Sequence, residues 1–143
     1  MADLTKIFTG MELGPEAIDA NFKAVEVIDS GWQTDGFTYI NGASASGGNC
    51  RWRVFQRGSI GLTVFNIGIN MPAMKYGQAT NFVSLPAAMM AASVDMDFGN
   101  LIRTGGNQLA GWGFNSNNLF INAFGDWTST NSADARGFFI FKK

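Results

Sequence analysis

Residues 50–69, CRWRVFQRGSIGLTVFNIGI, decide the fold because strand periodicity runs on both sides of a turn. Before the turn, Arg51 and Arg53 alternate with Trp52 and Val54. Successive side chains of a β-strand point to opposite faces, so this alternation separates two guanidinium groups from two apolar groups. The first part of the stretch is therefore predicted to be a strand with one buried face.

The second part of the stretch follows the turn at Arg57-Gly58 and runs from Ile60 to Ile69. It is rich in β-branched and apolar residues, as strands are. Its two predicted faces carry Gly61, Thr63, Phe65 and Ile67 on one side, and Leu62, Val64 and Asn66 on the other.

Further strands are expected after Gly31, because short aromatic or β-branched segments recur there between clusters of Gly, Asn and Ser. The predicted segments are Trp32–Asn41, Asn81–Leu85, Ala91–Phe98, Leu101–Thr104, Gln108–Asn115, Asn118–Phe124 and Gly137–Lys142. A turn at Gly99-Asn100 is expected to join the segments Ala91–Phe98 and Leu101–Thr104. The predicted fold is mainly β: an antiparallel β-sandwich or jelly-roll-like head over residues 32–143.

Residues 1–31 form a different segment, predicted to contain a short amphipathic helix. Pro15 suits the first helical position, and Glu16 and Asp19 lie near the positive end of the helix dipole. An apolar stripe follows at helical spacing, made of Ile18, Phe22, Val25 and Ile28. So short a helix is marginal alone, so we expect the stripe to pack on the chain's own sheet or on copies of the same helix.

The composition excludes several classes of function. The chain has 143 residues and a net charge of −1, with no Lys/Arg stripe, so a nucleic acid partner is not expected. No apolar run approaches the roughly 20 residues of a membrane span, and no secretory leader is visible. Neither a membrane partner nor secretion is therefore expected.

The sequence contains no histidine, and Cys50 is its only cysteine. An intrachain disulfide, a cysteine-based zinc site and every Ser-His or Cys-His nucleophile are therefore excluded. We expect no cofactor, no metal and no catalytic residue.

Charge is distributed unevenly along the chain. Residues 1–31 hold six acidic and two basic residues, whereas the remainder holds eight basic and five acidic residues. This asymmetry indicates either head-to-tail packing of copies or a solvated helix face.

Asp95 and Asp97 are predicted to share one face of a strand, about 6.6–6.8 Å apart. Two carboxyl groups at such a separation can serve glycoside hydrolysis. The alternative is a pair of solvent-facing strand residues, which we favour because the sequence shows no sign of an apolar pocket beside them.

The last third of the chain combines aromatic and polar residues in a way that suits a sugar. Indole rings stack on the apolar faces of sugars, while amide, carboxylate and guanidinium groups bond their hydroxyls. The candidate saccharide site is Trp112, Asn115, Asp126, Trp127 and Arg136. We expect Trp127 to be the stacking platform in a polar loop over residues 125–136. The alternative is that Trp127 caps the core and the polar residues form turns.

The amino-terminal segment resembles the shoulder of receptor-binding proteins in the baseplates of lactococcal-type tailed phages. The resemblance rests on a short basic-apolar lead, a Gly-Met pair and a Gly-x-Glu-x-Ile entry into the helix. The matching residues are Lys6, Gly10, Met11, Gly14, Glu16, Ile18, Asp19 and Asn21. A weaker similarity runs through residues 84–86, 111–112 and 135–137, and the family's long repetitive neck is missing.

The resemblance implies a virion protein of the tail baseplate or tail tip, made in the host cytoplasm. It implies a homotrimer that joins an upper baseplate scaffold protein through residues 1–31 and binds host cell-wall polysaccharide without cleaving it. The trimer axis would be surrounded by the buried side chains of Ile18, Phe22, Val25 and Ile28. The lead from Leu4 to Leu13 would attach the trimer to the scaffold. A structural baseplate protein without saccharide affinity is the second hypothesis, and a glycan-degrading enzyme is the third.

Overall fold

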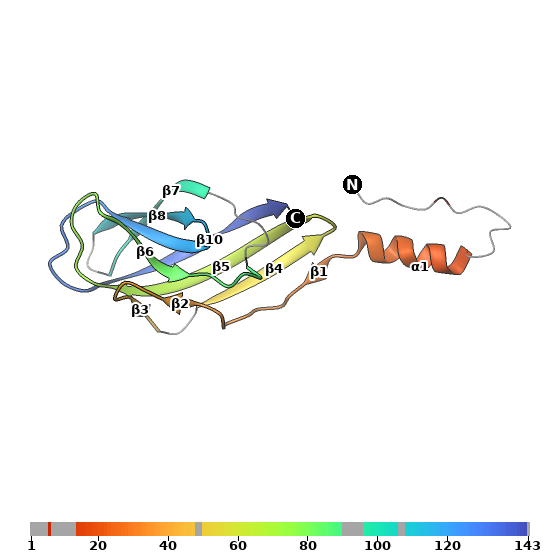
Figure 1. Ribbon diagram of the computed structural model, residues 1–143, viewed down its shortest axis with the longest axis horizontal. Coiled ribbons are helices and arrows are strands. Elements are labelled where there is room, and N and C mark those ends of the chain that lie inside the picture. Colours follow the sequence, from red (N-terminus) through yellow and green to blue (C-terminus); the bar gives the residue numbers. More distant parts are fainter. Residues whose placement is uncertain (1–5, 7–13, 48–49, 90–95, 106–107, 143) are drawn as a thin grey trace.

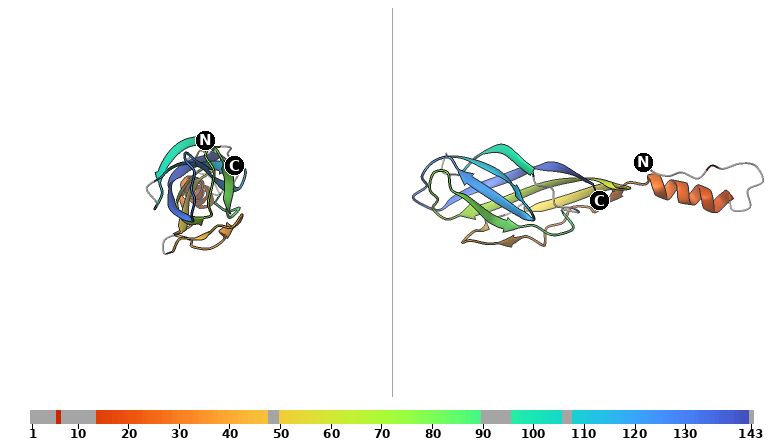
Figure 2. Two further views of the ribbon diagram at one scale, coloured as in Figure 1. Left: turned by 90° about the vertical axis from the view of Figure 1, so that its left-hand side faces the viewer. Right: turned by 45° about the horizontal axis from the view of Figure 1, so that its top comes forward.

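The computed structural model describes residues 6, 14–47, 50–89, 96–105 and 108–142, and only the backbone of 96–103. In this part the chain forms an elongated β-sandwich, and one helix projects from its end (Figures 1 and 2). The expected scaffold-binding lead, Leu4 to Leu13, lies outside the described residues apart from Lys6.

One sheet, here called sheet A, holds the strands that decide the fold. Its path is β1 (Ile28–Asp29), β4 (Arg51–Arg57), β5 (Ile60–Met71) and β10 (Asn131–Lys142), and β3 (Ser44–Ala45) also pairs with β5. β10 pairs with β5 along its whole length, from Asn131 opposite Met71 to Lys142 opposite Ile60. The two long strands therefore span the sandwich from one end to the other.

The other sheet, sheet B, closes the sandwich. Its order is β2 (Thr38–Tyr39), β6 (Ala79–Ser84), β9 (Asn118–Ala123), β8 (Leu109–Asn115) and β7 (Met96–Arg103). All the pairings in both sheets are antiparallel. The prediction of a mainly β protein with two antiparallel sheets and a short amino-terminal helix is confirmed.

The core lies between the sheets and is centred on aromatic rings. Phe65 on sheet A lies edge-on to Trp112 and Phe114 on sheet B, with ring centroids 5.5 and 5.3 Å away. Such edge-to-face contacts suit the ring quadrupoles. Gly61, Thr63, Phe65 and Ile67 share one face of β5, as predicted, and the structure shows that this face is the buried one.

Gly61 shows how tightly this core is filled. A Cβ atom at this position would lie 2.0 Å from Cζ of the buried Phe141 ring on β10. Only glycine fits there without displacing the ring.

The predicted strand Trp32–Asn41 is mostly absent. Only β2 and an isolated bridge between Gln33 and Trp52 are present in this range. Gly36 between them has a φ of +84°, and a Cβ on it would lie 2.8 Å from Cβ of Pro86. The chain turns at this glycine instead of continuing as a strand.

The predicted turn at Gly99-Asn100 is wrong, because β7 runs through both residues. Its register with β8 shifts between Met96 and Asn100, so an irregularity in the strand accommodates the Gly-Asn pair. The predicted Asp95–Asp97 pair lies outside the described side chains.

The helix α1 spans Gly14–Val25, which is shorter than the predicted stripe. Ile28 was expected on the helix, but it lies in β1 opposite Gln56 of β4. The β-branched residues around Val27 favour an extended chain, and pairing with β4 satisfies its backbone groups. The sandwich thus begins at β1 and not at Trp32.

Candidate functional site

The structure buries Trp127, which was expected to be the exposed stacking platform. Its side chain is 2% exposed and belongs to the core. Its backbone N–H donates to the carbonyl of Met74 at 2.7 Å, and its carbonyl accepts from Met74 N at 3.2 Å. This bridge pairs Trp127 with the segment after β5. The prediction that Trp127 is exposed is therefore wrong, and the alternative, that it is a core residue, is confirmed.

The other predicted saccharide residues are not brought together. Trp112 is buried in the aromatic core. Asn115 ends β8, whereas Asp126 follows β9 at the opposite end of the β8–β9 hairpin, about 20 Å away along the strand. Arg136 lies on the outer face of sheet A, where it bonds Asp134 and Asn66. The predicted loop 125–136 is also shorter, because β10 begins at Asn131.

Asp126 is the predicted residue that lies beside a depression in the surface. Its Oδ1 accepts a hydrogen bond from the backbone N–H of Tyr76 at 2.8 Å. Its carbonyl accepts a bond of 3.3 Å from Nε2 of Gln108, and Nζ of Lys75 lies 3.9 Å from Oδ2. Asp126 therefore links its own connection, between β9 and β10, to the segments around Tyr76 and Gln108. The connections β5–β6 and β9–β10 lie at the tip of the sandwich farthest from α1 (Figure 1).

Beside Asp126 the tip forms a depression of about 360 Å³, here called the polar hollow. Its lining is Gly105, Gln108, Thr128, Ser129, Thr130, Asn131 and Ser132. None of these lining residues is charged, and most present a hydroxyl or an amide.

Hydrogen bonds hold the walls of the polar hollow in place. Nδ2 of Asn131 donates to Oε1 of Gln108 at 3.0 Å, and Oδ1 of Asn131 accepts from Ser132 N at 3.1 Å. The backbone N–H of Gly105 donates to the carbonyl of Ser132 at 2.7 Å. A Cβ on Gly105 would meet Oγ of Ser132 at 2.5 Å, so a larger residue would disturb this wall. The amides are thus fixed before any ligand arrives.

The hydroxyls of Thr128, Ser129 and Thr130 line the mouth of the polar hollow. All three residues are exposed, and their hydroxyls bond none of the residues that the structure describes. Each hydroxyl can both donate and accept, as sugar hydroxyls do. The arrangement can therefore bind an uncharged polyhydroxyl ligand by exchanging hydrogen bonds with it.

Tyr76, whose backbone N–H bonds Asp126, carries an exposed aromatic ring that sequence reasoning missed. It is 74% exposed and lies in the turn between β5 and β6. Gly77 beside it has a φ of +73°, which a turn with a glycine allows. The available signal was a tyrosine within Lys75-Tyr76-Gly77-Gln78, a polar stretch between two apolar segments.

Cys50 makes contacts that are structural. Its Sγ lies 3.1 Å from the hydroxyl of Tyr39 and accepts a 3.2 Å hydrogen bond from Gly68 N. Burial, with the Cys50 contact, raises the pKa of Tyr39 well above its usual range. These contacts join β2 of one sheet to β5 of the other.

Comparison of the chain with known protein families, characterised proteins and solved structures found no match. In the part of the chain that the structure describes, no three His, Cys, Asp or Glu residues cluster as metal ligands do. No helix among the described residues is long and apolar enough to cross a membrane.

Proposed function

We propose that this protein is a phage baseplate or tail-tip attachment protein that binds host cell-wall saccharide without cleaving it. One observation carries the proposal: the uncharged polar hollow lies at the end of the sandwich opposite the exposed helix α1. The 12 residues of β5 separate these ends by about 37 Å. A protein with a ligand site at one end and an assembly element at the other suits attachment.

The polar hollow is the proposed saccharide site, in place of the site predicted around Trp127. The amides of Gln108 and Asn131 would bond sugar hydroxyls from fixed positions, and the hydroxyls of residues 128–130 would complete the contacts. Tyr76, near Asp126, would offer an apolar ring face for stacking.

Binding without cleavage is proposed because of the chemistry of the lining. Glycoside hydrolysis commonly uses two carboxyl groups, one on each side of the scissile bond. The described lining of the polar hollow presents hydroxyls, amides and a glycine. It is therefore suited to recognition and not to proton transfer.

The assembly end is proposed to form a homotrimer through α1 and to join an upper baseplate scaffold through residues 1–31. Ile18 and Phe22 on α1 are both exposed in the single chain, as expected for residues that a partner covers. A shallow polar site binds weakly, and several sites on one particle raise avidity by orders of magnitude.

Binding of host cell-wall polysaccharide to the purified protein tests the proposal. Ser129→Trp should fill the polar hollow and weaken binding at least tenfold, because its bulk would exclude the sugar. Ser59→Trp, in the exposed turn between β4 and β5 at the other end, is the matched control and should bind normally. Equal binding by both variants would remove the polar hollow from the proposal, and reducing ends released from cell wall would indicate an enzyme.

A structural baseplate protein is the second candidate, favoured by two apolar side chains at the tip. Leu109 and Phe124 are exposed there, and the backbone N–H of Phe124 donates to the Leu109 carbonyl. In this case another baseplate protein would cover the tip, and the purified protein would have no saccharide affinity.

A further inference from the structure

The outer face of sheet A carries an exposed apolar surface that the sandwich itself does not cover. Cross-strand pairing aligns Phe55, Leu62 and Ile140 in one row, and places Phe138 beside Val64 in the next. Phe138 is 67% exposed and Ile140 is 62% exposed. We name this surface the outer strip, and its residues are Phe55, Ile60, Leu62, Val64, Phe138 and Ile140.

The outer strip continues toward α1 through a small apolar depression of about 230 Å³. Val27 lies in its wall together with Phe55, Ile60 and Ile140. Val27 follows α1 almost immediately in the chain, so the helix and the outer strip meet at the same end of the molecule.

The outer strip is flanked by basic side chains. Five cationic groups lie on the same face of sheet A, at Arg51, Arg53, Arg57, Arg136 and Lys142. Asp29 pairs with Arg53, and Asp134 pairs with Arg136. The other three form no ion pair with any described residue. The face therefore favours a partner that is apolar and acidic.

The helix α1 has these two properties. Ile18 and Phe22 are exposed on its apolar side, and no residue of the helix is buried. Glu16, Asp19 and the following Glu26 are acidic, and Lys23 is already paired with Asp19 at 2.7 Å. The 12 residues of α1 make a helix about 18 Å long, which is enough to cover the outer strip along β5, roughly 14 Å from Ile60 to Val64.

We infer that the outer strip is the docking site for α1 of a second copy of this chain. The chain's own helix projects away from the sandwich (Figures 1 and 2). Two outer strips facing each other would bring the same cations together, which is unfavourable. A bundle made only of helices would also be weak. Ile28 lies in β1 and not on the helix, so the apolar stripe on α1 is only about two turns long.

A helix-to-sheet contact between copies is heterologous, and such contacts form a closed ring when the rotation permits. The inference rests on the proposed homotrimer and specifies how that trimer is built. Each copy would give its helix to one neighbour and receive a helix from the other. In this arrangement the acidic helix of one copy lies against the basic outer face of sheet A in the next copy, so a single contact explains both charges.

Light scattering at micromolar concentration tests the inference on the full chain. Phe138→Lys with Ile140→Lys should reduce the apparent mass threefold, to 15.4 kDa. The control, Leu109→Lys with Phe124→Lys, places the same charges on exposed apolar positions at the opposite end and should remain trimeric. If the outer-strip variant stays trimeric while Phe22→Asp is monomeric, the helices associate with each other and the inference is wrong. A monomeric wild type would overturn both the inference and the proposed trimer.

Cross-linking provides a second measurement that does not depend on dissociation. In a Cys50→Ser background, chains carrying Ile18→Cys are mixed with chains carrying Ile140→Cys and oxidised. Disulfide-linked pairs containing one chain of each kind support docking of α1 on the outer strip. Pairs formed by Ile18→Cys chains alone, with none in the mixed combination, contradict it.

Discussion

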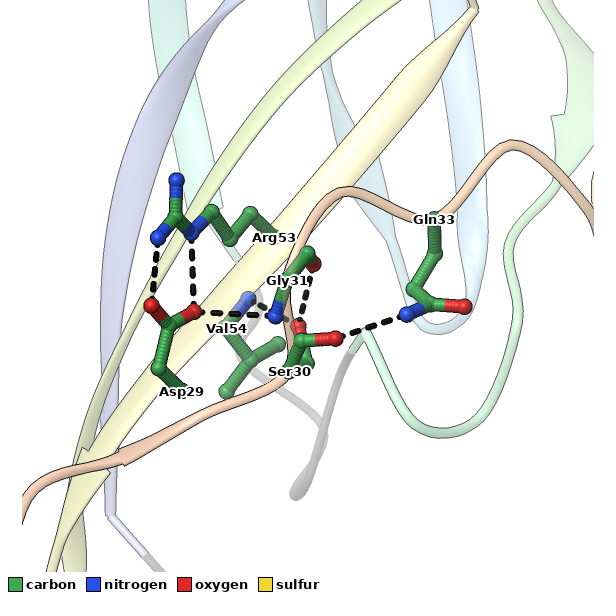
Figure 3. Close-up of polar contacts among 6 residues, drawn as sticks. All are labelled: Asp29, Ser30, Gly31, Gln33, Arg53 and Val54. Atoms are coloured by element: carbon green, nitrogen blue, oxygen red, sulfur yellow. Dashed lines mark hydrogen bonds and ion pairs between the residues drawn. The ribbon is translucent and has the colours of Figure 1, made fainter.

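Asp29 accepts two hydrogen bonds from the guanidinium of Arg53, so the segment after α1 is tied to β4 (Figure 3). The fork includes a 2.8 Å bond from Nε of Arg53, and the backbone N–H of Gly31 donates to the same carboxylate at 2.9 Å. Ser30 strengthens the attachment, since its N–H donates to the Val54 carbonyl and its Oγ accepts from Val54 N. These contacts hold β1 and the residue after it against β4.

Acid should weaken this attachment by protonating Asp29. The hydrogen bonds from Arg53, followed by that from Gly31, lower the pKa of Asp29 from 3.8 to about 2. Because the folded-state pKa is lowered, the stabilisation is fully present above pH 3.8 and is lost as the pH falls through 2. Carbon NMR of the Asp29 carboxyl group should show this titration. Arg53→Gln should return its midpoint toward 3.8, and an unchanged midpoint would contradict the assigned role of Arg53.

Gly61→Ala should destabilise the sandwich by about 1–3 kcal/mol, because the new methyl group overlaps the buried Phe141 ring. Urea unfolding followed by tryptophan fluorescence measures this change. Gly125→Ala is the control: no atom lies within 4 Å of its added Cβ, so its stability should change by no more than about 0.5 kcal/mol. Equal stability of the two variants would show that the core can adjust around Phe141.

Trp127→Ala should lower the free energy of unfolding by about 3–5 kcal/mol, because it empties a large volume in the core. Trp127→Phe should cost less, since Nε1 of Trp127 has no hydrogen-bond partner among the described residues. Thermal unfolding by circular dichroism compares them, with Trp32→Ala as the exposed control. A fully stable Trp127→Ala protein would argue against a core role.

Tyr76→Ala should weaken saccharide binding about tenfold or more while leaving the melting temperature unchanged. The ring is exposed, so its removal costs little folding energy, whereas a stacking anchor at a binding site is typically worth about 2 kcal/mol. Titration with cell-wall polysaccharide measures the affinity. Trp32→Ala removes an exposed ring that lies in neither the polar hollow nor the outer strip, and it should bind saccharide normally. Unchanged affinity in Tyr76→Ala would exclude the ring as a platform.

The sequence predicted the parts of the fold that local alternation determines. In β4 and β5 the alternation of residues predicted correctly which side chains share a face, but for β5 it did not indicate which face is buried. Gly36 and Gly99 were misjudged in opposite ways. The first ends a predicted strand, and the second is accommodated inside one. Whether a glycine turns the chain depends on its neighbours in space, which local sequence does not contain.

The candidate site could not be predicted because it is formed by contacts between residues that are far apart in the sequence. Trp127 appeared exposed because its sequence neighbours are polar, but the bridge to Met74 buries it. The polar hollow joins Gln108, in the connection between β7 and β8, to Asn131 at the start of β10, and the backbone of Tyr76, in the turn between β5 and β6, bonds Asp126. Of the predicted site residues, Asp126 is the exposed one that lies at this tip, next to the buried Trp127.

The pairing of β10 with β5 has a consequence for biosynthesis. β5 can form a hairpin with β4 as soon as both have left the ribosome, but its other neighbour is made only after the whole of sheet B. Until then a nascent chain carries an open strand edge of 12 residues, and such edges recruit strands from other chains. Chains growing side by side on one messenger RNA would therefore be open to exchanging their last strands until β10 pairs with β5 of its own chain.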